Sequence, residues 1–183
     1  DLVLTRELSS ADADSLVIHA WPDADLNGDV MHTKSTGGIF VEVARESRSM
    51  PLFFSCKKHE STSLHTPESE LVTLATYMRN EVLPLQELWQ RILQKPIHVV
   101  VHEDNTAAIT IVRKGYSPSL RCLPRTPRTS IGVVHETFHE PPPPGSGKCE
   151  LIYVESAKNK GDLMTKYLDR PALEKALEMI QVV

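Results

Sequence analysis

Residues 96–115, "PIHVVVHEDNTAAITIVRKG", place an apolar strand directly before a helix. The pattern of residues 96–103 is typical of a strand, and that of residues 104–115 is typical of a helix that ends at Gly115. A strand that leads straight into a helix is typical of βα units, which build sheets with parallel strands. An acidic residue, Asp104, stands where the strand gives way to the helix.

The segments on either side complete an α/β order. Short polar links separate three early strands, which favours an antiparallel meander. Residues 67–94 carry apolar residues at helical spacing, with a break or kink at Pro84. The sequence therefore predicts an α/β fold with a mixed five-stranded sheet, three antiparallel strands followed by parallel strands, flanked by helices. The other predicted elements are strands 15–21, 37–43, 51–57 and 149–155, and a final helical segment 161–183 that restarts near Pro171.

Length and composition fit a single domain over residues 1–183. Hydrophobic residues make up 40% of the chain, which is enough for a sizeable core. Residues 141–148, "PPPPGSGK", are predicted to form a stiff surface loop because four prolines hold the backbone extended. Because the chain does not begin with Met, we expect a processed or excised piece of a longer polypeptide.

Charge and cysteine content narrow the classes of protein. A net charge of -4 argues against binding nucleic acid by bulk charge alone, so such a role needs a local site or a metal. Three widely spaced cysteines, Cys56, Cys122 and Cys149, predict reduced thiols in an intracellular setting. No apolar run approaches the roughly 20 residues that span a bilayer, and the first residues lack signal-peptide features. We expect a soluble, non-secreted protein without a membrane partner.

Three aspartates stand near predicted junctions between elements. Asp23, in "WPDADLNGD" (21–29), follows the first strand, Asp104 follows the fourth, and Asp162 opens the final helical segment. Each has an ordinary alternative explanation, because Asp23 fits a solvated turn and the other two fit helix N-caps. The ends of parallel strands are nevertheless where such sheets usually bind ligands.

Glu70 shares the apolar face of the first predicted helix. At about 100° per residue, Leu74 lies about 40° and Tyr77 about 20° from Glu70 around the axis. Glu68 falls on the opposite side and is expected to face water. A buried charge is costly unless it is paired or bound to a cation, although an acid in the first turn also complements the helix dipole.

Together these four carboxylates predict a metal site. Clustered carboxylates repel one another, and hard divalent cations such as Mg²⁺ relieve that repulsion through oxygen ligands. Two such ions about 3.5–4 Å apart are the usual apparatus for cleaving a phosphodiester. We therefore expect two Mg²⁺ ions, with Mn²⁺ as the alternative ion, and phosphodiester hydrolysis.

Five stretches of the chain carry a family resemblance. They are "WPDADLNGD" (21–29), "TKSTGG" (33–38), "SCKKHESTSLHTPESEL" (55–71), "HEDNTAAI" (102–109) and "YVESAKNKGDLMTK" (153–166). In order and approximate spacing they resemble the ribonuclease H domain of copia-type retrotransposon polyproteins, in the reverse transcriptase/RNase H family. The resemblance runs from about residue 14 to residue 168. Residues 1–13 look like the connecting segment that follows the polymerase part.

The resemblance implies a ribonuclease H-like fold and an endonuclease that hydrolyses the RNA strand of RNA–DNA hybrids during retrotransposon reverse transcription. Its four metal-binding acids map onto Asp23, Glu70, Asp104 and Asp162. The first three would hold an ion that positions the attacking water, and Asp23 with Asp162 would hold the ion that stabilises the leaving 3′-oxygen. The implied partners are the hybrid and the reverse transcriptase part of the same polyprotein. The implied location is intracellular, in a cytoplasmic particle or the nucleus.

Basic side chains are the candidates for gripping the nucleic-acid backbone. Hybrids are distinguished by A-like geometry and 2′-hydroxyl groups. Each candidate is otherwise an ordinary solvated charge. Because the chain is net acidic, we expect weak intrinsic hybrid binding, with the polymerase part supplying much of the affinity. The candidates are Lys57, Lys58, Arg113, Lys114, Arg121, Arg125 and Arg128.

Two other functions stay open. One is a catalytically inactive ribonuclease H-like binding or scaffolding module, which Pro22 favours because a proline in a central strand removes a ladder hydrogen bond beside Asp23. The other is an integrase-like or transposase-like strand transferase, although that class typically uses three acids and a DNA-binding appendage. His135 and His139 are expected to be surface histidines of a helix.

Overall fold

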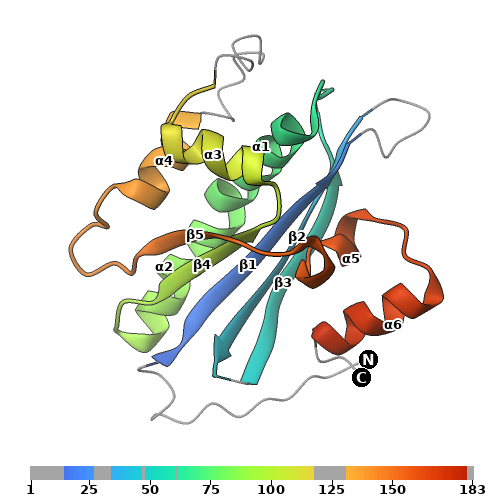
Figure 1. The fold of residues 1–183 in the computed structure, drawn as a ribbon. Helices are drawn as coiled ribbons and strands as arrows, with labels where there is room; N and C mark the ends of the chain where they lie inside the picture. The colour runs from blue at the N-terminus through green and yellow to red at the C-terminus, as the bar shows by residue number, and fades with distance from the viewer. Residues whose placement is uncertain (1–14, 27–33, 47, 61, 118–130, 181–183) are drawn as a thin grey trace.

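A computed structural model describes residues 15–26, 34–46, 48–60, 62–117 and 131–180 of the chain. In this part of the chain the strands form one mixed sheet in the order β3-β2-β1-β4-β5 (Figure 1). β1, β2 and β3 pair antiparallel, whereas β4 runs parallel to both β1 and β5. The predicted mixed five-stranded sheet is confirmed. The strands are β1 (Val17–Asp25), β2 (Thr36–Arg45), β3 (Arg48–Lys58), β4 (His98–Glu103) and β5 (Cys149–Tyr153).

Helices cover both faces of the sheet, with α1 and α2 behind it in Figure 1 and α5 and α6 in front. The larger core lies between the sheet and α1 and includes Ile18, Val41 and Leu74. A smaller core on the opposite face joins Trp21 and Phe40 to α6. The helical segments are α1 (Thr66–Tyr77), η2 (Met78–Val82), α2 (Leu83–Leu93), α3 (Thr106–Lys114), α4 (Ile131–His139), η3 (Ser156–Lys158), α5 (Asp162–Thr165) and α6 (Arg170–Met179).

The helix predicted over residues 67–94 is broken, as Pro84 indicates. A π-helical segment, Met78–Val82, separates α1 from α2, and Pro84 stands in the first turn of α2. Proline has no N–H to donate to the carbonyl four residues earlier, so the regular α-helical ladder is interrupted just before it. The final helical segment is likewise two helices, because Asp169 caps the start of α6 and Pro171 follows in its first turn.

β1 extends further than predicted, through Pro22 to Asp25. Its pairing with β4 ends at Ala20, whereas its pairing with β2 continues without a register shift to Asp25. The missing N–H of Pro22 therefore interrupts no β1–β4 ladder. Asp23 consequently lies inside the strand and not in a turn after it, which corrects the prediction.

The structure also bears on the predictions made for the cysteines, for His135 and His139, and for membrane spans. Cys56 and Cys149 are free thiols, while Cys122 lies outside the described residues. His135 is half-buried and its Nδ1 lies 2.8 Å from the carbonyl oxygen of Val112, so it joins α4 to α3 and is only partly at the surface. His139 is exposed, as expected. Among the described helices, none combines the length and apolarity needed to cross a membrane.

A histidine pair lies on the face of the sheet that α5 and α6 cover. The Nδ1 atom of His19 is 2.9 Å from Nε2 of His102, and the Trp21 ring stacks on His102 at 4.4 Å between centroids. The ammonium of Lys160 lies 4.6 Å above the Trp21 ring and 2.6 Å from the carboxylate of Glu42. One histidine nitrogen must accept while the other donates, so the contact requires that at least one ring be neutral.

We predict that this pair reduces stability in acid. Burial, with the charges of His19 and Lys160, lowers the pKa of His102 from 6.5 to about 3. A histidine whose pKa is lower in the folded state keeps its full contribution above its unfolded pKa and loses it as pH falls below that value. His102→Gln should therefore flatten the fall in melting temperature between about pH 7 and pH 5. His139→Gln, at an exposed position, should not, and equal slopes in all three proteins would contradict the prediction.

Candidate active site

The candidate site lies where the adjacent parallel strands β1 and β4 separate. In the sheet, β2 lies on one side of this strand pair, next to β1, and β5 lies on the other side, next to β4. Pairing between β1 and β4 stops at Ala20 and Val101, so both strands extend past their last paired residues. Sheets of this kind bind ligands at such a switch in strand order, outside the carboxyl ends of the strands.

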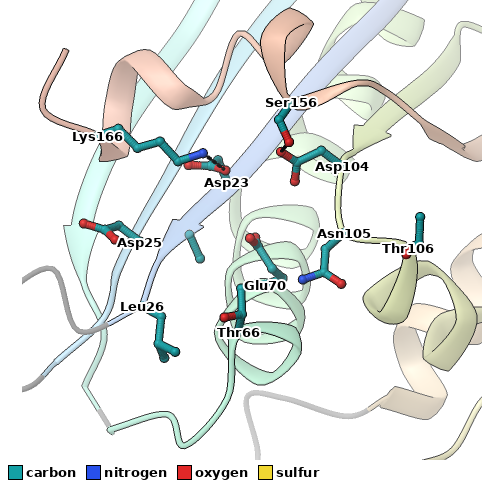
Figure 2. A pocket seen from close by; sticks show the side chains of 11 residues that line it. Asp23, Asp25, Leu26, Thr66, Glu70, Asp104, Asn105, Thr106, Ser156 and Lys166 are labelled. Carbon is teal, nitrogen blue, oxygen red and sulfur yellow. Dashed lines mark hydrogen bonds and ion pairs between the residues drawn. The ribbon is translucent and has the colours of Figure 1, made fainter. Parts of the chain in front are cut away.

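Asp23, Glu70 and Asp104 meet at this position. One ligand oxygen from each lies within 4.8 Å of those from the other two. They line an open pocket of about 490 Å³, and Figure 2 shows their side chains gathered around it. Asp23 and Glu70 are 1% and 3% exposed, so both carboxylates are almost completely removed from water. The structure thus brings together three of the four acids that the sequence singled out.

Asp104 points toward the pocket because its neighbour caps the helix. The side chain of Asn105 accepts hydrogen bonds from the backbone N–H groups of Ala107 and Ala108, both at 3.0 Å. Asp104 is therefore not the N-cap of α3, which corrects that alternative. Its Oδ2 atom instead accepts a hydrogen bond of 2.6 Å from the hydroxyl of Ser156, in the segment that leads to α5.

Glu70 is buried, as its helical position predicts, but the expectation that Glu68 faces water is wrong. Glu68 is also buried, and its Oε2 accepts a hydrogen bond of 2.9 Å from the backbone N–H of Leu64. The chain before α1 folds back over the first helical turn, and a helical wheel does not contain that information. Glu68 has a partner, whereas the Oε2 atom of Glu70 has none among the described residues.

Asp162 joins the cluster from the opposite face of the sheet. The ammonium of Lys166 lies 2.7 Å from Oδ1 of Asp162 and 3.4 Å from Oδ1 of Asp23, so it bridges the two carboxylates. Asp162 is the first residue of α5 and makes no side-chain cap. Gly161 allows this approach, because a Cβ atom there would lie 2.6 Å from the carbonyl oxygen of Trp21 and 2.9 Å from Cβ of Asp23.

A fifth carboxylate, Glu103, was missed in the sequence. It is completely buried, its Oε1 accepts a hydrogen bond of 3.0 Å from the backbone N–H of Asn105, and its Oε2 has no partner in the described part of the chain. The alternation of β4 contained the signal, because Glu103 shares a strand face with the buried Val99 and Val101. Lys166 was also missed, although it stands four residues after Asp162, one helical turn away.

Burial and mutual repulsion raise the pKa values of the clustered acids. Burial is the largest cause in each case, and it raises the pKa of Asp23 to about 6, that of Glu103 to about 8 and that of Glu70 to about 10. Burial also raises the pKa of Asp162. Burial alone would lower the pKa of Lys166, but its hydrogen bond to Asp162 and the surrounding carboxylates raise it. Without a cation, the cluster therefore retains protons at neutral pH.

These residues fit a divalent cation with hard oxygen ligands. Two buried carboxylate oxygens, one on Glu70 and one on Glu103, lack hydrogen-bond partners among the residues described. A buried acceptor without a partner is costly, and a cation would satisfy it. Mg²⁺ and Mn²⁺ prefer carboxylate oxygens, so the donor set matches these ions better than it matches softer metals.

The basic candidates do not line the pocket where the structure describes them. Lys57 and Lys58 end the edge strand β3, and the ammonium of Lys57 lies 3.7 Å from Glu81. Arg113 and Lys114 occupy the last turn of α3, whose first turn faces the pocket. Of the basic residues that the structure describes, Lys166 lines the pocket. The remaining candidates, Arg121, Arg125 and Arg128, lie outside the described residues.

Comparisons with known proteins give distant structural likenesses. No protein-family profile and no curated protein sequence matches the chain. The chain is similar to the N-terminal RNase H domain of a protein from Mycobacterium tuberculosis, solved as a fusion with maltose binding protein, at 14% identity and a TM-score of 0.46, covering 90% of this chain and 98% of that one. It is also similar to the protease-reverse transcriptase of prototype foamy virus, at 10% identity and a TM-score of 0.39, covering 92% of this chain and 20% of that one. Function therefore has to be inferred from the carboxylate pocket itself.

We predict that Glu70→Gln stabilises the metal-free protein. The pKa of Glu70 is raised from 4.5 to about 10, so the free energy of unfolding decreases as pH rises through this window. A neutral glutamine avoids the cost of keeping this carboxyl protonated above its unfolded pKa, and we expect about 1–3 kcal/mol of added stability near neutral pH. Glu68→Gln is the matched control in the same helix and should lower stability, because it weakens the hydrogen bond to Leu64. Denaturant unfolding in chelator checks both, and a less stable Glu70→Gln protein would count against the prediction.

We also predict that Mg²⁺ or Mn²⁺ raises the melting temperature. An ion present at about ten times its dissociation constant adds about 1.4 kcal/mol, which corresponds to about 3–6 °C for a chain of this size. Asp104→Asn should reduce this shift because it removes one ligand oxygen. Scanning calorimetry with and without chelator measures it, and an unaltered melting temperature at millimolar metal would refute a formed site.

Proposed function

We propose that the protein is a metal-dependent ribonuclease H that cuts the RNA strand of RNA–DNA hybrids endonucleolytically during retrotransposon reverse transcription. The convergence of Asp23, Glu70 and Asp104, with ligand oxygens within 4.8 Å of one another, is the observation that carries the proposal. The mixed sheet supports it, because the family that the sequence resembles has a ribonuclease H-like fold. The same resemblance, to copia-type polyproteins, supplies the substrate class.

Each carboxylate has a distinct task in this proposal. Two divalent cations, when bound, would activate the attacking water and stabilise the leaving 3′-oxygen. Asp23 would contribute to both ions, because it contacts the Glu70 side of the pocket and also the Lys166 bridge to Asp162. Glu70 and Asp104 would hold the first ion and Asp162 the second.

Neighbouring groups hold these acids in position. The hydroxyl of Thr165 donates a hydrogen bond to Oδ2 of Asp23, and the hydroxyl of Ser156 donates to Asp104. Glu103 accepts a hydrogen bond from the backbone N–H of Asn105, and its proximity helps to raise the pKa of Glu70. Rigid orientation of ligands by such contacts commonly tunes metal sites. We infer that these three residues act through the acids and not on the substrate.

The hybrid would enter through the open side of the pocket. Thr66 and Thr106 line it with hydroxyl groups, which can recognise the 2′-hydroxyls that distinguish RNA from DNA. The exposed Lys57 and Lys58 remain candidates for backbone contacts. The reverse transcriptase part of the same polyprotein would supply further affinity, in an intracellular particle or the nucleus.

The unbroken register at Pro22 supports an active enzyme over an inactive scaffolding module. Pro22 pairs with Ile39 and Asp23 with Gly38, without a bulge between them. Pro22, which favoured an inactive module, therefore leaves Asp23 in the strand and close to Glu70 and Asp104.

We predict that the unaltered chain cuts the RNA strand of a labelled RNA–DNA hybrid when Mg²⁺ or Mn²⁺ is present and not in chelator. Asp23→Asn and Glu70→Gln should each reduce the rate by about a hundredfold or more, since both remove charge that the ions require. Glu136→Gln, an exposed acid on α4, is the matched control and should retain full activity.

The outcomes separate the alternatives. Cleavage that needs metal and both acids supports the hydrolase. A folded, metal-binding protein that leaves the hybrid intact, with or without the attached polymerase part, would instead favour a binding module. Cleavage of the DNA strand or joining of DNA ends would point to a different enzyme of the same fold.

A further inference from the structure

The two sides of Asp23 differ in how well their carboxylates are satisfied. On the α1 side, Glu70 and Glu103 each keep a buried oxygen without a partner in the described part of the chain. On the α5 side, Thr165 and Lys166 both donate to Asp23. On the α5 side, the ammonium of Lys166 already serves as a cation. On the α1 side, the oxygens of Glu70 and Glu103 have no such partner among the described residues.

Lys166 occupies the position between Asp23 and Asp162. Its ammonium lies 3.4 Å from Oδ1 of the first and 2.7 Å from Oδ1 of the second, on the pocket wall. Figure 2 shows its side chain extended toward Asp23. The side chain is 37% exposed and carries four rotatable carbons, so it can leave this position without unfolding α5.

We propose that Lys166 is an internal cation that competes with the second divalent ion for Asp23 and Asp162. This inference rests on the proposed function and adds to it an order in which the two ions bind. The first ion enters between Glu70 and Asp104, where the Oε2 atom of Glu70 has no hydrogen-bond partner among the described residues. The second binds only when the ammonium of Lys166 moves away, so it binds more weakly.

The competition follows from charge and space. An ammonium at hydrogen-bonding distance from two carboxylates occupies the oxygens that a second ion needs, and its positive charge repels that ion. The side chain of Asp23 is 1% exposed and that of Asp162 is 23% exposed, so the repulsion is screened less than at an open surface. Removing the ammonium should thus tighten the second ion and, without metal, leave the acids uncompensated.

The test measures ion binding by the whole chain without any substrate. Mn²⁺ and Mg²⁺ are titrated by calorimetry, and melting temperatures are recorded with metal and with chelator. The variants are Lys166→Met, Lys166→Gln, which keeps donors and guards against misfolding, and Lys166→Arg, which keeps the charge. Lys148→Met is the matched control, because Lys148 pairs with Glu150 on the surface.

Loss of the charge in Lys166→Met and Lys166→Gln should tighten the weaker binding step by about tenfold. The same variants should melt lower in chelator and show a larger upward shift with metal. Lys166→Arg and Lys148→Met should bind ions as the unaltered chain does.

Unchanged or weaker ion binding in both charge-removing variants would overturn the inference while leaving the proposed function intact, provided that the unaltered chain binds metal and cuts the hybrid. Tightened binding in a chain that never cuts the hybrid would support the inference and refute the function. If neither the unaltered chain nor the variants bind ions, both proposals fail.

Discussion

Repulsion among buried carboxylates is the constraint that organises this end of the molecule. Asp23, Glu70 and Glu103 are each almost or completely removed from water, and their pKa values are raised. A chain that only needed stability would place apolar side chains here, since buried ionic groups rarely repay their desolvation. The local structure instead keeps the acids together, using protons, hydroxyl donors and one lysine to hold a cluster that a cation would stabilise.

Backbone details far apart in the sequence make this cluster geometrically feasible. Asn105 caps α3 and thereby leaves Asp104 available to the pocket. Gly38 lies opposite Asp23 on β2, and a Cβ there would come within 2.6 Å of Met164, so this glycine lets α5 pack close to the strand. Gly161, just before α5, allows the same close approach to β1 at Trp21 and Asp23. Two glycines and one cap therefore help to bring Asp23, Asp104 and Asp162 together.

The sequence predicts the features that depend on neighbouring residues, but not the contacts between residues that lie far apart in the chain. The succession of strands and helices along the chain and the buried position of Glu70 follow from apolar periodicity, which each element carries within itself. Glu68 was misplaced because its partner comes from the loop before the helix, and Lys166 was overlooked because its role depends on Asp23, 143 residues away. The alternation of β4 predicts that Glu103 is buried, although the sequence pattern alone pointed to the adjacent Asp104. Contacts between segments decided the cases of Glu68 and Lys166.

The charges of the cluster also indicate what it is built to bind. Among the described residues, the cluster consists of five carboxylates, those of Asp23, Glu70, Glu103, Asp104 and Asp162, and the ammonium of Lys166. Fully ionised, they leave four negative charges uncompensated, which two divalent cations would neutralise. One ion alone would leave the α5 side dependent on Lys166, and the lysine already stands there. An asymmetric cluster of this kind tolerates the absence of its second ion better than that of its first, so the unpaired oxygens of Glu70 and Glu103 mark the side where binding must begin.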